Sequence, residues 1–223
     1  MNAHRVAITG VGAVSAAGVG APVLIDLVLE GRSAIRPDPA LGGLPSGAAP
    51  DLPPDRRTRR LDRAARFFVA AGEEAWADAG LPAHPEDGDR YAVIEGSSLG
   101  PLGELLGEHQ AMLASGDTRP PSPLTMVRYT LGAAAALLAQ EHHVHGPVFH
   151  LAASSASAML AIGEAYLKVA WGLVDVALAG GAECPLQRDV AAAFLASGIL
   201  ARDNGTPAAC RPFDLHRAGT VLG

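Results

Sequence analysis

One stretch decides the fold of this chain, and it reads Gly146-Pro147-Val148-Phe149-His150-Leu151-Ala152-Ala153-Ser154-Ser155-Ala156-Ser157-Ala158-Met159. Its apolar start predicts a buried strand over residues 148–152, its small residues predict a tight turn, and a helix is expected over residues 156–171. This order places one side chain at a helix N-terminus, where unpaired N–H groups and the helix dipole favour a thiolate. The residue at that place is a serine, Ser155.

Ser155 has two interpretations. A serine hydroxyl is a weak nucleophile and needs a general base within hydrogen-bond reach before it reacts. The Gly-x-Ser-x-Gly elbow of hydrolases is not matched, because Ala153 and Ser157 stand where that motif has glycines. A structural serine at a helix start is therefore as compatible with the chemistry as a nucleophile is.

The segments on either side of this stretch continue the same alternation. Further strands are expected over residues 5–10, 90–95 and 174–179, and further helices over residues 21–30, 62–79, 101–114, 126–140 and 189–198. Residues 33–60 are rich in Pro, Gly and Arg without periodicity and are expected to form a long surface loop. This alternation predicts an α/β fold, a mostly parallel sheet covered by helices on both faces, within one domain over residues 1–223.

Composition narrows the classes of function. The 223 residues carry a net charge of -6, and Lys168 is the only lysine, so no basic patch is expected and nucleic acid is not expected as a partner. No apolar run reaches the roughly 18 residues of a membrane span, and the N-terminus lacks the apolar core of a secretory signal. Cys184 and Cys210 are too few for a disulfide framework. These features predict a cytoplasmic protein.

Two further motifs are better explained by structure than by ligand binding. Gly10-Val11-Gly12 follows an expected strand, but Ser15 replaces the third glycine of a dinucleotide fingerprint, and the expected acidic residue is not in place. A tight turn is favoured there. His142, His143 and His145 lack further ligands at regular spacing, so a solvated loop is favoured over a metal site. We expect neither a metal nor a cofactor.

Several motifs, taken in order, resemble the N-terminal half of the β-ketoacyl-ACP synthases, which are condensing enzymes with a thiolase-type fold. The resemblance runs from Arg5 to Gly223 and implies that only the N-terminal half of that fold is present. The matching segments are residues 5–12, 71–82, 146–147, 179–183, 211–214 and 217–223.

The resemblance has consequences for catalysis. Counting without gaps from Gly146-Pro147 places the family's catalytic cysteine, which carries the acyl chain as a thioester, at Ser155. The two catalytic histidines of the family belong to its C-terminal half, and the only histidine after Ser155 here is His216, in the closing signature. Ala218 and Thr220 also replace the acidic and aromatic residues of that signature. The resemblance therefore implies a chain that is inactive alone.

The same resemblance implies a role beside an active enzyme. The leading hypothesis is a chain-length-factor-like subunit of a type II polyketide or fatty-acid system, paired with a full-length ketosynthase and, through that complex, with acyl carrier protein. Family members dimerise through the strand before the nucleophile, here residues 148–152. The positions implied for the acyl pocket or dimer interface are Gly100, Thr125, Met126, Tyr129, Phe149, His150 and Phe194. Ordinary core or interface positions explain these residues equally well.

Two alternatives remain open from the sequence. In the first alternative, the chain is a fragment or a Cys-to-Ser variant of a catalytic β-ketoacyl-ACP synthase, which performs a decarboxylative Claisen condensation. In the other alternative, Ser155 is the nucleophile of a serine acyltransferase or hydrolase and acts with a base from elsewhere.

Overall fold

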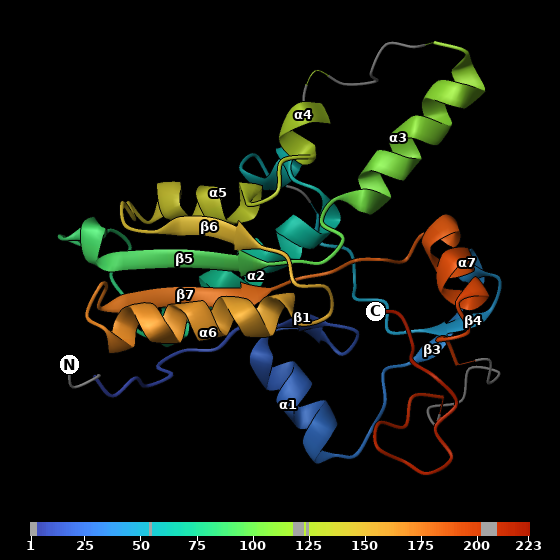
Figure 1. Ribbon diagram of the computed structural model, residues 1–223, viewed down its shortest axis with the longest axis horizontal. Coiled ribbons are helices and arrows are strands. Elements are labelled where there is room, and N and C mark those ends of the chain that lie inside the picture. The colour runs from blue at the N-terminus through green and yellow to red at the C-terminus, as the bar shows by residue number, and fades with distance from the viewer. Residues whose placement is uncertain (1–3, 54, 118–122, 124, 202–208) are drawn as a thin grey trace. The chain divides into compact units, whose positions relative to one another are not determined.

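The computed structural model describes residues 4–53, 55–117, 123, 125–201 and 209–223 (Figure 1). These residues group into two compact units, whereas the sequence was interpreted as one domain. The sheet unit consists of the residues up to 13 and residues 52–183, and the second unit consists of residues 14–51 and 184–223.

A three-stranded parallel sheet forms the centre of the sheet unit. Its strands are ordered β6 (Val148–Leu151), β5 (Tyr91–Gly96) and β7 (Val176–Gly181). The helices α2 (Arg63–Asp78) and α5 (Ala133–Glu141) lie on one face, and α6 (Ser157–Ala170) lies on the other (Figure 1). The predicted parallel α/β sheet with helices on both faces is therefore confirmed.

The central strand β5 is apolar on both sides because both of its faces are covered. Ala92 and Ile94 pack in the cluster under α6, and Val93 packs in the cluster under α2 and α5. All three are at most 1% exposed. A strand buried on both faces has a continuous apolar run instead of an alternating one, and this is the pattern by which the sequence predicted it.

The helix α2 begins and ends close to the predicted residues. Asp62 is its N-cap, and the Asp62 carboxylate accepts the N–H of Ala65 at 3.1 Å. Gly80 follows the helix with φ of 63°, a left-handed value that glycine adopts without strain. Local capping signals were therefore sufficient to locate this helix.

The expected helix over residues 126–140 is wrong as a single element. The structure has a short α4 (Thr125–Arg128) and a separate α5, with Gly132 between them at φ of 80°. A left-handed residue cannot continue a right-handed helix, so the alanine-rich segment starts again after Gly132. Helix α3 (Leu102–Ser115) precedes α4 and has no buried residue.

The expected strand over residues 5–10 is also wrong. This segment joins no sheet, and Ile8 is 86% exposed. Gly10 and Gly12 lie against α2, and a Cβ on Gly12 would lie 1.9 Å from the carbonyl oxygen of Ala71. The N–H groups of Val11 and Ala13 donate to side chains of the same helix, Asp78 and Glu74. Close packing on α2 therefore explains Gly10 and Gly12, in place of a dinucleotide site.

The second unit contains shorter elements. The pairs β1 (Val14–Ser15) with β2 (Gly18–Val19) and β3 (Arg36–Asp38) with β4 (Leu44–Ser46) are antiparallel. The helices are α1 (Ala21–Leu29), η1 (Pro39–Leu41) and α7 (Arg188–Ala196), and Leu41, Ala191, Leu200 and Leu222 form the core. The expected long loop over residues 33–60 is therefore partly ordered. Residues 33–60 contain the β3–β4 hairpin and η2 (Thr58–Arg60), and η2 belongs to the sheet unit. A further short helix of that unit, η3 (Gly88–Arg90), precedes β5.

Two glycines allow α6 to approach the carboxyl ends of the strands. A Cβ on Gly96, the last residue of β5, would lie 2.3 Å from the carbonyl oxygen of Ser157 in the first turn of α6. A Cβ on Gly181, the last residue of β7, would lie 2.1 Å from the carbonyl oxygen of Gly96. Backbone therefore packs directly on backbone where the Ser155 turn leads into α6.

One acidic side chain is buried inside the sheet unit. Glu95 on β5 is 6% exposed, and its carboxyl group accepts the N–H of Ala135 at 3.3 Å. Burial raises the pKa of Glu95 to about 7; the Ala135 N–H opposes this shift, and the nearby charge of Asp62 adds to it. Glu95 is therefore neutral in part of its population at neutral pH.

Replacing Gly96 by alanine tests the close approach of α6. We expect Gly96→Ala to lower the free energy of unfolding by about 2–3 kcal/mol, because the new Cβ meets a backbone carbonyl that cannot move alone. Gly107→Ala is the matched control: it lies in α3 with nothing within 4 Å of the added Cβ. It should raise the stability by about 0.5–1 kcal/mol. Urea unfolding measures both, and equal effects would contradict the packing.

The buried Glu95 should make stability depend on pH. Its pKa is higher in the folded chain, so the folded state holds the proton more tightly, and stability falls as pH rises from about 4.5 through about 7. The loss from this group is about 3 kcal/mol. Glu95→Gln should remove this dependence, leaving the variant more stable than the wild type at pH 8. Unfolding curves from pH 5 to 8 that are parallel for both proteins would contradict it.

Candidate functional site

The turn after β6 is held by Ser157 and not by Ser155. The Ser157 hydroxyl accepts the N–H of Ala153 at 2.9 Å and donates to the carbonyl oxygen of Ser154 at 2.6 Å. Ser154 has φ of 52°, a left-handed value that is uncommon outside glycine. Helix α6 begins at Ser157 with Ala156 as its N-cap, so Ser155 precedes the cap. The predicted strand, turn and helix are all present.

Ser155 itself is exposed and not activated. Among the described residues, its hydroxyl has no hydrogen-bond partner, so no general base is positioned on it. An unassisted serine hydroxyl does not act as a nucleophile at neutral pH. The turn therefore presents Ser155 at the surface, with no hydrogen-bonded base in the part of the chain that the structure describes.

The loop after β5 lies at the same carboxyl end of the sheet and is fixed by Glu183. The Glu183 carboxylate accepts hydrogen bonds from the Ser97 hydroxyl and from the N–H groups of Ser98 and Leu99. The Ser97 hydroxyl in turn accepts the N–H of Gly100 at 2.9 Å. Residue 100 has φ of 54°, and a Cβ there would lie 2.4 Å from Leu131. These contacts hold the predicted pocket position Gly100 in place.

The structure brings Gly100 and His150 together. Both line one cavity of about 10 Å³ in the sheet unit, which Glu95 also lines. His150 and Glu95 face each other on neighbouring strands, with His150 Nδ1 3.9 Å from Glu95 Oε2. Sequence reasoning did not identify Glu95, since nothing in the sequence alone pairs position 95 with position 150.

Phe149 lies on the opposite face of β6 from His150. Its ring packs in the cluster under α6, and the ammonium of Lys168 lies 5.2 Å from the ring centre. Neighbouring residues of a strand point to opposite faces, so Phe149 and His150 contribute to different surroundings.

Thr125 and Tyr129 share a partner in α3. The Glu108 carboxylate accepts the Thr125 hydroxyl at 2.8 Å, the Tyr129 hydroxyl at 2.6 Å and the Arg128 guanidinium at 3.2 Å. Burial acts to raise the pKa of Glu108, but these bonds outweigh it and lower that pKa. Burial and the Glu108 contact raise the pKa of Tyr129 to about 12. Met126, a predicted position on α4 beside Thr125, is 74% exposed.

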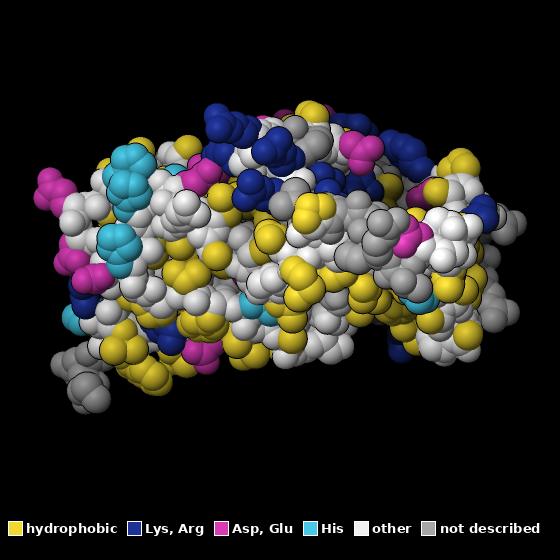
Figure 2. Space-filling view, turned by 90° about the horizontal axis from the view of Figure 1, so that it is seen from above, with side chains coloured by type: hydrophobic (Ala, Val, Ile, Leu, Met, Phe, Trp, Pro, Cys, Tyr) yellow, Lys and Arg dark blue, Asp and Glu magenta, His cyan; other side chains and the backbone are white. Residues whose placement is uncertain are grey.

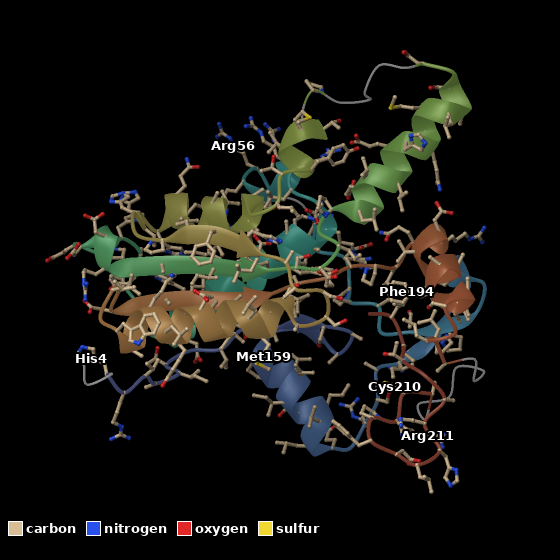
Figure 3. The ribbon with its side chains drawn as sticks, in the orientation of Figure 1. His4, Arg56, Met159, Phe194, Cys210 and Arg211 are labelled. Atoms are coloured by element: carbon tan, nitrogen blue, oxygen red, sulfur yellow. The ribbon has the colours of Figure 1, made fainter. Side chains whose placement is uncertain are left out.

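Phe194, the last predicted position, belongs to the second unit. It lies on α7 (Figure 3) and packs against the core that contains Leu41 and Leu200.

A cluster of arginines is a feature that the sequence interpretation missed. The expectation of no basic patch is wrong, because six arginines follow one another within η2, α2 and the residues before them. Figure 2 shows dark blue side chains gathered together on one face. Arg56, Arg59 and Arg60 are exposed and form no ion pair with a described residue. This arginine cluster consists of Arg56, Arg57, Arg59, Arg60, Arg63 and Arg66.

The prediction that the three histidines near α5 form a solvated loop is wrong for one of them. His142 is buried, stacks on Trp76 with ring centres 4.1 Å apart, and lies 3.1 Å from the Glu73 carboxylate. His143 and His145 are exposed as expected. In the described ranges, no three potential ligands gather to hold a metal ion. No helix in those ranges is long and apolar enough to cross a membrane.

Comparisons with known proteins agree with this geometry. Residues 53–223 match the family model for the β-ketoacyl synthase N-terminal domain. A polyketide β-ketoacyl synthase 1 of Streptomyces halstedii is 33% identical over 238 residues, which cover 99% of this chain and 56% of that protein. Nodulation protein E of Rhizobium meliloti is 34% identical over 229 residues, with the same coverage of both chains. The chain thus spans about half the length of the curated relatives it matches.

Solved structures give the same picture. A ketosynthase/chain length factor for ishigamide is 28% identical with a TM-score of 0.80, and the match covers 98% of this chain and 56% of that one. A β-ketoacyl synthase of Burkholderia phymatum is 30% identical with a TM-score of 0.79, covering 97% and 56%. A type II polyketide ketosynthase in complex with its acyl carrier protein is 25% identical with a TM-score of 0.82, covering 99% and 56%. The chain therefore belongs to the β-ketoacyl synthase family, with the thiolase-like fold of its N-terminal half.

Proposed function

We propose that this chain is a non-catalytic, chain-length-factor-like partner of an active ketosynthase. It shapes the acyl tunnel while a polyketide or fatty-acid chain grows on acyl carrier protein. The observation that carries the proposal is Ser155: the family register places the nucleophile there, yet its hydroxyl is exposed and has no base among the described residues. The turn keeps its backbone and lacks the activated side chain.

Relatives support a paired role. One similar structure is a ketosynthase/chain length factor, and another is a ketosynthase with its acyl carrier protein. The proposal extends those two associations to this chain.

The edge strand β6 supplies a surface for the partner ketosynthase. Within the described sheet, β6 pairs only with β5. The carbonyl oxygens of Pro147 and Leu151 accept N–H groups from the β5 side, at Val93 and Ser97. In a parallel ladder, the intervening residues Val148 and His150 then direct their backbone groups outward. An open edge with free N–H and C=O groups suits pairing with a strand of a second subunit.

Helix α4 is suited to contact the partner's tunnel. The Glu108 carboxylate fixes Thr125 and Tyr129, while Met126 between them remains exposed. Methionine is a flexible apolar side chain that adapts to an irregular surface. Met126 is therefore the residue we assign to set how long a chain fits, on a helix held in place by its neighbours.

The arginine cluster supports a carrier-protein partner. The exposed guanidinium groups of Arg56, Arg59 and Arg60 form a positive surface on a chain whose net charge is -6, whereas Arg57 is paired with carboxylates. Such a patch would attract a protein with an acidic surface and increase its rate of association. We propose that acyl carrier protein, presented in the complex, is that partner.

A proline at the outward edge of β6 tests the paired role. Val148→Pro removes an N–H that faces away from β5, so the fold should persist, as edge strands tolerate proline. Co-expression with the partner ketosynthase should yield a stable complex for the wild type. The variant should associate at least tenfold more weakly, as the loss of a ladder hydrogen bond predicts. Product formation by the ketosynthase should fall in parallel.

The control for this experiment is Val28→Ala, an exposed valine on α1 outside the surfaces assigned to the partner, which should leave association intact. The proposal fails if the wild-type chain purifies without the ketosynthase and the ketosynthase makes the same products in its absence.

A further inference from the structure

A small cavity lined by both polar and apolar residues lies beside the edge strand, and the proposed function does not use it. Its volume is about 10 Å³, which is close to the space that one water molecule or one oxygen atom needs. Gly132 and Gly100 border it, and each has a left-handed φ. A Cβ on Gly132 would lie 3.3 Å from the Cβ of His150, so the missing side chains help to keep the space open. Thr130 and Leu131, which also line it, are exposed, so the cavity reaches the surface there.

His150 is an unsatisfied hydrogen-bonding group in this cavity. Its side chain is 9% exposed, and both of its ring nitrogens are buried without a hydrogen-bond partner. Burial lowers the pKa of His150. The nearby Ser97 backbone favours the charged imidazole and opposes this shift, but it lies outside hydrogen-bond geometry and its effect is smaller. A neutral imidazole has one N–H donor and one acceptor nitrogen. A buried group of this kind is stabilised by any ligand that supplies the missing bond.

Glu95 and Asp62 restrict what that ligand can be. Both carboxyl groups line the cavity, and a fixed anion would be repelled by either one when it is ionised. A metal ion is not favoured, since no three ligands gather suitably in the described residues. A neutral oxygen, in contrast, can accept from the imidazole N–H and can also bond to the Glu95 carboxyl group.

We infer that this cavity is a subsite for one neutral carbonyl or hydroxyl oxygen on the acyl chain, bound by His150 with Glu95 beside it. The inference rests on the proposed function, because a chain reaches Gly100 and His150 only if this surface borders the tunnel of the complex. A saturated chain would cover the imidazole and leave it unpaired. The oxygen of an oxygenated chain would accept the imidazole N–H and so satisfy one of the two unpaired ring nitrogens, and for this reason the subsite selects for oxygenated chains.

The test uses the complex of this chain with its ketosynthase. Carrier protein is loaded with octanoyl or with 3-, 5- or 7-oxooctanoyl groups, and kcat/KM for elongation is measured for each. At least one oxo chain should be preferred over octanoyl, and His150→Leu should reduce that preference about tenfold. His150→Gln keeps a donor and should retain part of it. Leu151→Met, on the other face of β6, is the matched control and should leave the ratio unchanged.

The outcomes separate the two proposals. If His150→Leu does not assemble, His150→Met makes the same apolar replacement with a more adaptable side chain. An assembled, active complex with the same oxo-to-octanoyl ratio in the wild type and the apolar variant overturns the subsite alone; this is the result for a cavity that holds only water. A wild-type chain that forms no complex overturns the proposed function, and the subsite with it.

Discussion

The close approach of α6 to the carboxyl ends of β5 and β7 is the constraint on which the sheet unit depends. Backbone meets backbone where Gly96 lies against Ser157 and Gly181 lies against Gly96, and no Cβ fits at either glycine. This contact fixes where the helix begins and therefore where the preceding turn places Ser155. The same end of the sheet holds the loop that Glu183 pins and the cavity beside His150. Ligand sites of parallel sheets occur at this end, because loops converge there.

In the turn after β6, the residue that holds the backbone differs from Ser155. Ser157 makes the hydrogen bonds that hold its backbone, so the conformation does not need a particular side chain at position 155. Under the proposed function, the family's nucleophile can therefore be replaced there without loss of the fold. The chain would then act through recognition, by the edge strand β6, the exposed Met126, the arginine cluster and the cavity beside His150.

The sequence predicted the parts of the fold whose signals are local. Strands β5, β6 and β7 are rich in apolar residues, and α2 has Asp62 and Gly80 at its ends. It failed where one contact overrides the pattern. Residues 5–10 have a strand-like composition but join no sheet, since Gly10 packs on α2, and Gly132 interrupts an alanine-rich helix. The Ser155 turn was predicted, since strand and helix adjoin it. The Glu95–His150 pair was not, because strand register across 55 positions depends on tertiary packing.

The most direct test of the central claim is covalent labelling of Ser155 in the assembled complex. The complex is treated with a fluorophosphonate and, separately, with acyl-loaded carrier protein, and this chain is examined by intact-mass spectrometry. Ser155→Cys, treated with iodoacetamide, shows that the position is accessible. The account predicts no adduct on the wild-type chain and full alkylation of the cysteine variant. A stoichiometric acyl or phosphonyl adduct on Ser155 would contradict the account, since it would show an activated nucleophile at this turn.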